Sequence, residues 1–148
     1  MAVKVGIDGD LYLCEDGIGG TPTWTEVEAA RDVSCSLKKG EADASTRGKG
    51  KWKLTVATMK EAEITFELLY DDEDEVAETI LDAWLDDTPI GLAVAKDDIT
   101  KAGTKVFMAD CVILTWDEKE PMDGAVLVSV TAKPTYTENR PKFITVGQ

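Results

Sequence analysis

The stretch AEITFELLY at residues 62–70, followed by DDEDEVAETILDAWLDD at residues 71–87, decides the fold of this 148-residue chain. Its first half alternates polar and apolar residues, which is the period of a β-strand with one buried face. The residues that face one way are Ile64, Phe66, Leu68 and Tyr70. We therefore expect a strand over Ala62–Tyr70 whose apolar face packs on a core.

After this strand the apolar residues recur at spacings of three and four, which is typical of one face of an α-helix. Asp72 is a suitable N-cap, and Glu75, three residues later, completes a capping box. Pro89 disfavours a helical residue before it, so the helix is expected to end near Asp87. The sequence predicts one amphipathic helix, Asp72–Asp87, that packs on a sheet through its apolar stripe. The stripe comprises Val76, Ala77, Ile80, Leu81, Trp84 and Leu85.

The rest of the chain reads as β-strands separated by turns rich in Gly, Pro and Asp. We expect a single domain over residues 1–148, mainly β (α+β), with terminal arms. Its architecture is an antiparallel β-barrel or sandwich of six to eight strands with one flanking amphipathic helix. The other expected strands are Asp10–Cys14, Val33–Lys39, Trp52–Thr58, Ile90–Lys96, Lys105–Trp116, Ala125–Lys133 and a short one at Phe143–Val146, and Trp24–Val27 alternates briefly.

Charge excludes two classes of partner. Acidic residues outnumber basic residues by 29 to 16, and the formal net charge is −13. Wrapping of nucleic acid and docking on anionic lipid both need basic surfaces, so neither is expected.

No apolar run approaches the length of a membrane span. The three cysteines lack the spacing of a metal or redox motif, which indicates reduced thiols in a cytoplasmic compartment, with Cys35 and Cys111 in the core.

The residues that most catalytic sites use are missing. The chain has no histidine, which removes His-based triads, His metal ligands and the commonest general base near neutral pH. The acidic run Asp71–Glu75 lacks the ligand spacing and glycine of a calcium-binding loop and is typical of a helix start. Gly17–Gly20 is not followed by the residues of a phosphate-binding loop. We expect no catalytic residue, metal or cofactor, and no enzymatic activity.

Basic residues concentrate in one part of this acidic chain. Between Lys38 and Lys53 lie six cations and two acids, and Gly40–Gly50 has the composition of a long mobile loop. This loop is either a solvated hairpin tip or an arm that docks on the acidic face of another copy. A contact between two different patches is head-to-tail and propagates into rings or filaments.

The four tryptophans leave other functions open. Trp52 and Trp84 fit the apolar patterns of their strand and helix, so we expect both in the core. Trp24 or Trp116 could stack on a sugar in a non-catalytic small-ligand or glycan-binding β-barrel. A carboxylate enzyme with two acids in a cleft is a further alternative.

The order of these features resembles the tail tube (major tail) proteins of long, flexible-tailed phages, which are related in fold to the type VI secretion tube protein. The polar loop carries Asp43-Ala44-Ser45-Thr46-Arg47-Gly48, similar to the D-x-(S/T)-T-(R/S) run of those proteins. A Trp52–Thr58 strand, a Glu-rich strand leading into an acidic helix, and a final long hairpin follow in the same order.

The resemblance implies that six copies form a ring whose sheets join into a continuous inner β-barrel. Rings stack into a hollow tube for phage DNA through the terminal arms and the long loop. Other expected partners are a tape measure, an initiator and a terminator protein. The expected location is the virion tail, after assembly in the host bacterial cytoplasm. The loop residues expected to make the stacking contacts are Lys38, Lys39, Asp43, Thr46, Arg47, Lys49 and Lys51.

A tube that conducts DNA without holding it needs an acidic or neutral inner wall, because a basic wall binds phosphates. The outward faces of the predicted strands offer candidates for lumen or outer-wall charges. These are Glu63 and Glu67 on the central strand and Asp110 and Lys133 on the late hairpin.

Overall fold

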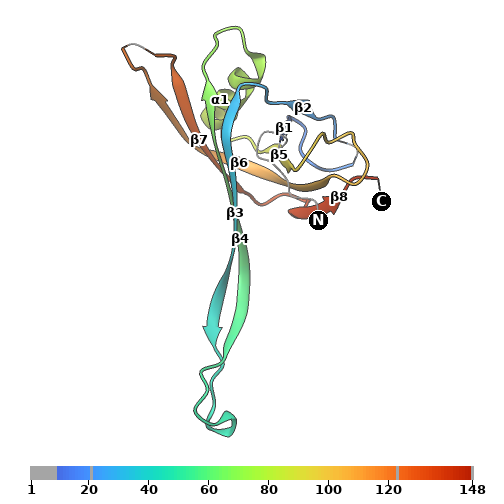
Figure 1. Ribbon diagram of the computed structural model, residues 1–148, viewed down its shortest axis with the longest axis vertical. Helices are drawn as coiled ribbons and strands as arrows, with labels where there is room; N and C mark the ends of the chain where they lie inside the picture. The colour runs from blue at the N-terminus through green and yellow to red at the C-terminus, as the bar shows by residue number, and fades with distance from the viewer. Residues whose placement is uncertain (1–9, 21, 123, 148) are drawn as a thin grey trace.

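One antiparallel sheet contains all eight strands of the described residues, 10–20, 22–122 and 124–147, in the computed structural model (Figure 1). The strand order is β2-β1-β5-β6-β7-β4-β3, and β8 also pairs with β6. Each predicted strand overlaps a strand of the sheet, and two of them fall in β4. Their bounds are β1 Asp10–Cys14, β2 Thr25–Glu26, β3 Ala30–Asp43, β4 Thr55–Leu69, β5 Ile90–Ala95, β6 Lys105–Lys119, β7 Leu127–Pro134 and β8 Lys142–Thr145.

The sheet bends on itself without closing. The first part of β6 pairs with β5 on one edge and with β8 on the other, and its second part pairs with β7. A register shift between Ile113 and Thr115 lies near this change of partner, where a bulge bends the strand. β2 and β3 end the strand order, although only residues 27–29 separate them in sequence. The expectation of a sandwich is therefore confirmed, and that of a closed barrel is wrong.

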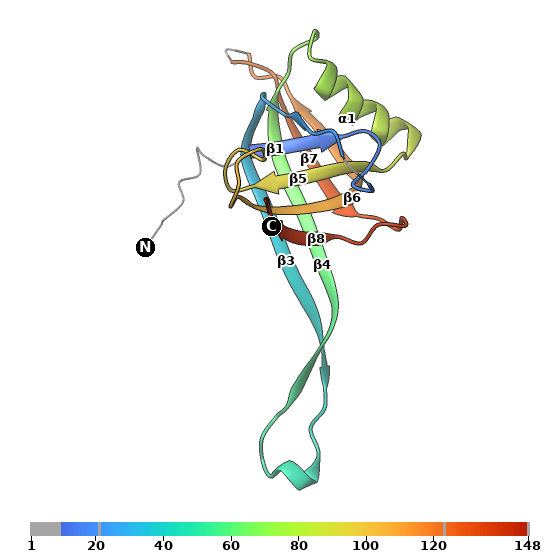
Figure 2. The same cartoon turned by 90° about the vertical axis from the view of Figure 1, so that its right-hand side faces the viewer.

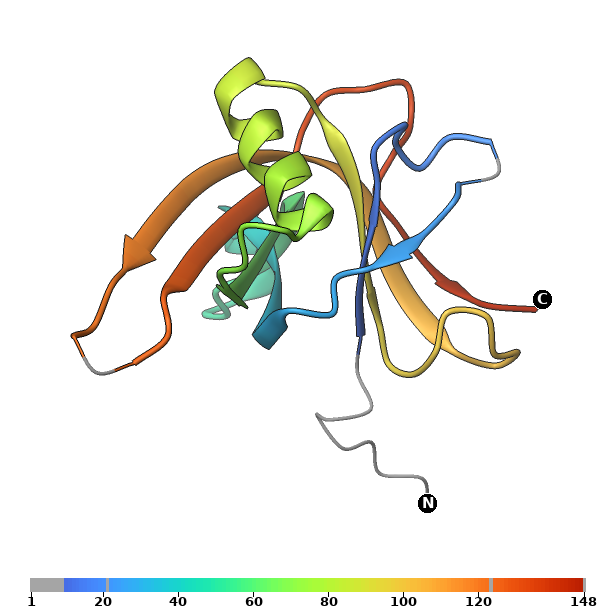
Figure 3. The ribbon, with the colours of Figure 1, turned by 90° about the horizontal axis from the view of Figure 1, so that it is seen from above.

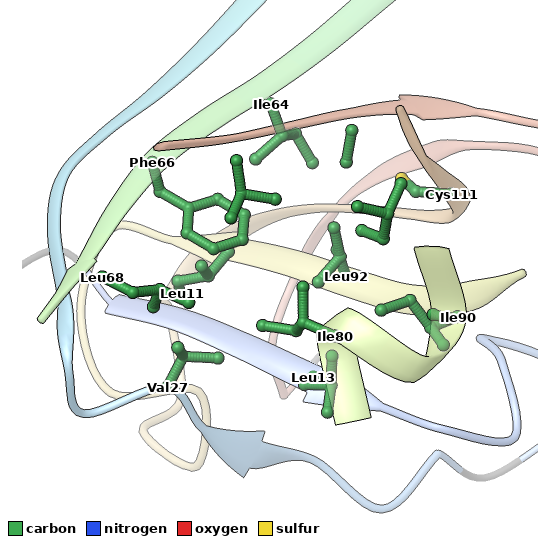
Figure 4. Packing of buried hydrophobic residues seen from close by; sticks show 14 of the residues in the cluster. Leu11, Leu13, Val27, Ile64, Phe66, Leu68, Ile80, Ile90, Leu92 and Cys111 are labelled. Carbon is green, nitrogen blue, oxygen red and sulfur yellow. The ribbon is translucent and has the colours of Figure 1, made fainter. Parts of the chain in front are cut away.

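The core lies inside this bend and follows the predicted alternation of β4. Ile64, Phe66 and Leu68 are buried, and Figure 4 shows them facing side chains of β1, β5 and α1 (Glu75–Asp86). Burying each such side chain stabilises the fold by about 1.5–3 kcal/mol. Tyr70, expected on the same face, is exposed because it follows the last residue of the strand.

The helix forms as predicted but is shorter at its start. The N-cap is Asp74, whose side chain accepts a hydrogen bond from the Val76 backbone N–H at 3.0 Å, so the capping box from Asp72 is wrong. The helix ends at the predicted place, because Asp87 adopts a left-handed conformation with φ 54°. From above, β6 arches across the molecule and α1 lies over it (Figure 3).

The apolar stripe of the helix is only partly buried. Ala77, Ile80 and Ala83 are buried, and Val76 and Leu81 are partly exposed. Trp84 is 41% exposed and Leu85 is exposed, so the expectation of a core Trp84 is wrong. The bent sheet covers only a narrow strip of the helix surface. The apolar stripe predicted from the sequence spacing is wider than this strip.

The largest departure from expectation is the hairpin of β3 and β4. The predicted strands Trp52–Thr58 and Ala62–Tyr70 belong largely to one strand, β4, and β3 continues to Asp43. The loop expected at Gly40–Gly50 therefore lies at residues 44–54 and includes a short 3-10 turn, Arg47–Lys49. Residues 38–61, here called the arm, pair only within themselves and project from the body (Figure 2).

The chain's ends give two further results. β8 pairs with β6, so the C-terminal segment through Thr145 belongs to the sheet and is no free arm. The expected N-terminal arm lies outside the described residues. Within the described ranges, no helix has the length and apolar character needed to cross a bilayer.

Candidate assembly surfaces

The arm brings together the stacking residues predicted from the sequence. All of them are exposed and lie on the arm's first strand, β3, or in its loop. Lys38 pairs with Glu61 across the ribbon, and Lys39 pairs with Lys60. The residues are Lys38, Lys39, Asp43, Thr46, Arg47, Lys49 and Lys51.

The tip of the arm has local structure of its own. The Asp43 carboxylate accepts a hydrogen bond from the Ser45 backbone N–H at 2.8 Å, and hydrogen bonds to Ser45 hold its pKa below the usual value. The Ser45 hydroxyl accepts from the Leu54 backbone N–H at 2.8 Å, which closes the base of the loop. Gly50 has φ 75°, and its N–H donates to the Arg47 carbonyl at 3.3 Å. These bonds form a defined turn that directs the tip cations outward.

Apolar side chains on the arm are exposed, which the sequence reading missed. Trp52 is 77% and Met59 81% exposed, so the expectation that Trp52 lies in the core is wrong. An alternating sequence predicts a strand, but a projecting two-stranded ribbon has no second layer to cover either face. Exposed apolar patches of this kind mark interaction surfaces. Leu54 and Val56 complete the set, and Leu37, which precedes the arm on β3, is exposed as well.

A groove lies at the end of the molecule opposite the arm tip, where β4 leads into α1 (Figures 1 and 2). It runs between residues 25–29 and residues 69–76 and has a volume of about 1120 Å³. We call it the acidic groove. Its carboxylates are Glu26, Glu28, Asp71, Asp72, Glu73 and Asp74, and its apolar residues include Leu69, Tyr70 and Val76.

Two residues of the acidic groove, Glu26 and Tyr70, have raised pKa values. Burial, followed by the negative charges of Asp10 and Glu28, raises the pKa of Glu26. Asp72, through a side-chain hydrogen bond and its charge, raises the pKa of Tyr70. Among the described residues that line the groove, none is Lys or Arg. The groove therefore has a negative potential that no lining cation offsets.

The candidate wall charges on the central strands are placed as the alternation predicts. Glu63 and Glu67 are partly exposed on β4, and Lys133 is exposed on β7. The Lys133 ammonium lies 3.9 Å from the Glu63 carboxylate across the two strands. These two charges largely offset each other at the base of the arm.

Asp110 is different, and its interpretation as a wall charge is wrong. The residue is only 4% exposed, because the loops on either side fold over this part of β6. Its Oδ1 accepts from the Ile18 backbone N–H at 2.7 Å. Its Oδ2 accepts from the Thr137 hydroxyl at 2.8 Å and from the Asn139 amide at 3.1 Å. Strand alternation indicates which face a residue points to, but it cannot show that a loop covers that face.

The remaining tryptophans pack against the body. Trp24 and Trp116 are partly buried against apolar clusters, and the Trp116 indole N–H donates to Glu118 at 2.9 Å. The Trp84 indole N–H donates to the Leu114 carbonyl at 3.2 Å. Within the described ranges, no group of three or more Cys, Asp or Glu side chains is arranged to hold a metal ion.

Solved structures support the same fold. The chain is similar to the tail of the empty gene transfer agent (GTA) particle with C6 symmetry, at TM-score 0.70 and 15% identity, over 96% of this chain and 99% of that one. It is also similar to the SPP1 tail tube, at TM-score 0.67 and 13% identity, over 88% and 75% of the two chains. The anti-feeding prophage baseplate matches at TM-score 0.62 and 8% identity, over 100% and 99%.

Sequence comparison gives the family directly. No curated protein matches the chain significantly. The family model described as phage tail tube protein matches residues 11–135, which covers β1 to β7 and the whole arm. The chain therefore belongs to the phage tail tube protein family and is a structural subunit of a virion tail.

Proposed function

We propose that six copies of this chain form a ring and that rings stack, through the arm, into a hollow tube that conducts phage DNA. The observation that carries the proposal is the arm itself. Residues 38–61 extend from the body, and their exposed apolar and cationic side chains do not stabilise a single subunit. Family membership and the C6 symmetry of the similar GTA tail support a ring of six.

In this proposal the domain is single, and the arm is its stacking device. The contacts to the next ring come from the arm's strands and tip, including Lys38, Thr46 and Arg47. The tip is the mobile part of the free subunit, because every residue of its loop is exposed and few apolar contacts hold it. Ordering costs about 1–2 kcal/mol per residue for the backbone, and the buried apolar area of the stacked state offsets that cost.

The conduit role follows from charge. With a net charge of −13 per subunit, stacked rings have no surplus of cations to hold phosphates. The offset pair Glu63 and Lys133, together with Glu67, are the candidates for the tube walls. The role is structural and needs no catalysis. A tape measure, an initiator and a terminator protein are the partners of such a tube, which assembles in the host bacterial cytoplasm.

Electron microscopy of concentrated protein tests the proposal. The wild-type chain is expected to form rings and tubes. In a shortened variant, an Asn-Gly turn replaces residues 39–60 and links Lys38 to Glu61. These two residues face each other in the ribbon, so a two-residue turn can connect them. This variant should fold and form rings but no tubes. Tubes of normal length without the arm would overturn the stacking role, and sedimentation as a single subunit at high concentration would overturn ring formation.

A further inference from the structure

We propose that the arm tip of one copy docks in the acidic groove of a copy in the next ring. This inference rests on the proposed stacking and names the surface that receives the arm. Both surfaces are exposed in the single subunit, and they lie at opposite ends of its long axis (Figures 1 and 2). An arm therefore reaches the groove of another copy and cannot reach its own.

The tip supplies only positive charge. Residues 44–54 contain four cations and no carboxylate, and every residue of the loop is exposed. The cations are Arg47, Lys49, Lys51 and Lys53. Ion pairs within the described parts of the chain join Lys101 to Asp97 and Lys133 to Glu63, so none uses a tip cation.

The groove supplies only negative charge and does so from two segments. Glu26 and Glu28 lie on one side, and the carboxylates of residues 71–74 lie on the other. Burial, followed by the charges of Asp10 and Glu28, raises the pKa of Glu26, and a docked cation stabilises the charged form of this carboxyl. Complementary potentials of this kind set the orientation and rate of association.

Apolar side chains match as well. Leu69 is 38% exposed and Tyr70 43% exposed where they line the groove. Trp52 lies at the tip between Lys51 and Lys53. Its ring can therefore cover Leu69 and Tyr70 while the two lysines pair with the groove carboxylates. Residues that contribute most of the binding energy of protein interfaces are enriched in Trp, Tyr and Arg, and they lie near the centre of the interface in well-packed pockets.

The geometry also explains why the contact repeats. A tip and a groove are different patches, so the contact is head-to-tail. Every stack therefore has free tips at one end and free grooves at the other. The exposed face of α1 is also acidic, at Asp82 and Asp86, but these residues are not among those that line the groove. The groove combines concavity, exposed apolar side chains and concentrated negative charge in one place.

Charge reversal in the full-length protein tests the pairing. The tip variant carries Lys49→Glu, Lys51→Glu and Lys53→Glu. The groove variant carries Glu26→Lys, Glu28→Lys, Asp72→Lys and Glu73→Lys, so four lysines outnumber the two remaining groove carboxylates. It spares Asp71 and Asp74, whose carboxylates accept backbone hydrogen bonds at 3.0 Å. A matched control carries Lys96→Glu, Lys105→Glu and Lys119→Glu, which are exposed residues outside the tip.

Each variant alone has a tip and a groove of like charge, so stacking should weaken by at least about tenfold in apparent association constant. An equimolar mixture of the two variants restores both tip–groove pairs and should recover association and alternating tubes. The control should stack like the wild type. Sedimentation velocity measures association, and electron microscopy counts rings and tubes.

The outcomes separate this inference from the proposed function. If wild type forms tubes but the mixture associates no better than its components, the tip–groove pairing is wrong and stacking stands. If the mixture associates in pairs or chains but no variant forms rings, the pairing stands and the ring is wrong. Equal loss in the control would assign the effect to net charge and overturn the pairing.

Discussion

At the scale of single residues, Asp110 shows how a buried charge holds two loops in place. Gly17 approaches this carboxylate with φ 87°, and a Cβ at residue 17 would lie 2.8 Å from Oδ1. The carboxylate binds residues on both sides: Ile18 precedes β2, while Thr137 and Asn139 lead into β8. The hydrogen bonds thereby fix how the first loop and the C-terminal segment cover the sheet.

Asp110→Ala should reduce the free energy of unfolding by about 2–4 kcal/mol, because three donors lose a charged acceptor and some remain buried. Urea denaturation measures the loss. Asp117→Ala, at an exposed position on the same strand, is the control and should change stability by less than about 0.5 kcal/mol. A loss below about 1 kcal/mol for Asp110→Ala would show that the loops are held by other contacts.

At the scale of elements, the helix carries two residues, Ile80 and Trp84, that the sequence pattern assigns to the same apolar stripe but that differ in burial. Ile80→Ala should cost about 2–5 kcal/mol, because Ile80 is fully buried and its removal leaves a cavity. Trp84→Ala should cost less, about 1–2 kcal/mol, because the ring is 41% exposed and contributes one indole hydrogen bond. Thermal or urea unfolding of both variants compares them directly, and an equal or larger loss for Trp84 would contradict the difference.

The arm leads to a prediction of the opposite kind. Trp52→Ala should leave the free energy of unfolding within about 0.5 kcal/mol of wild type, because Trp52 is 77% exposed on a projecting loop. The same variant should form fewer tubes, since it removes the aromatic anchor proposed for stacking. Denaturation and pelleting of tubes give the two readouts. A large loss of stability would show that Trp52 packs in the core.

Local patterns predicted the elements because strand and helix periods depend on neighbouring residues. Asp10–Cys14 has the predicted bounds, and the helix ends at Asp87 as the following Pro89 indicates. Burial depends on what lies opposite in space, so Trp52 and Trp84 were assigned to the core by the same patterns and are exposed. The acidic groove joins segments about forty residues apart in sequence, and no local pattern marks such a site.

At the scale of the whole molecule, the separation of charge decides how the protein meets DNA. Cations gather on the arm, while the chain as a whole has a net charge of −13. Double-stranded DNA should therefore bind weakly, with a dissociation constant above about 1 μM at physiological salt, where screening acts over about 8 Å. Fluorescence anisotropy with a labelled duplex measures this, and submicromolar, salt-sensitive binding would identify a DNA-binding protein instead of a conduit.

The projecting arm has one more consequence, for the subunits that wait to assemble. Beyond the body, β3 and β4 each have one edge without a strand partner among the described residues, and such edges invite pairing with another chain. Charged residues of both signs lie along these edges, Lys38, Lys39, Glu41 and Asp43 on β3 and Lys60 and Glu61 on β4. Pairing of two arms edge to edge would take these charged side chains out of water, so they protect a concentrated pool of subunits against amyloid-like aggregation until the arm docks on a neighbouring ring.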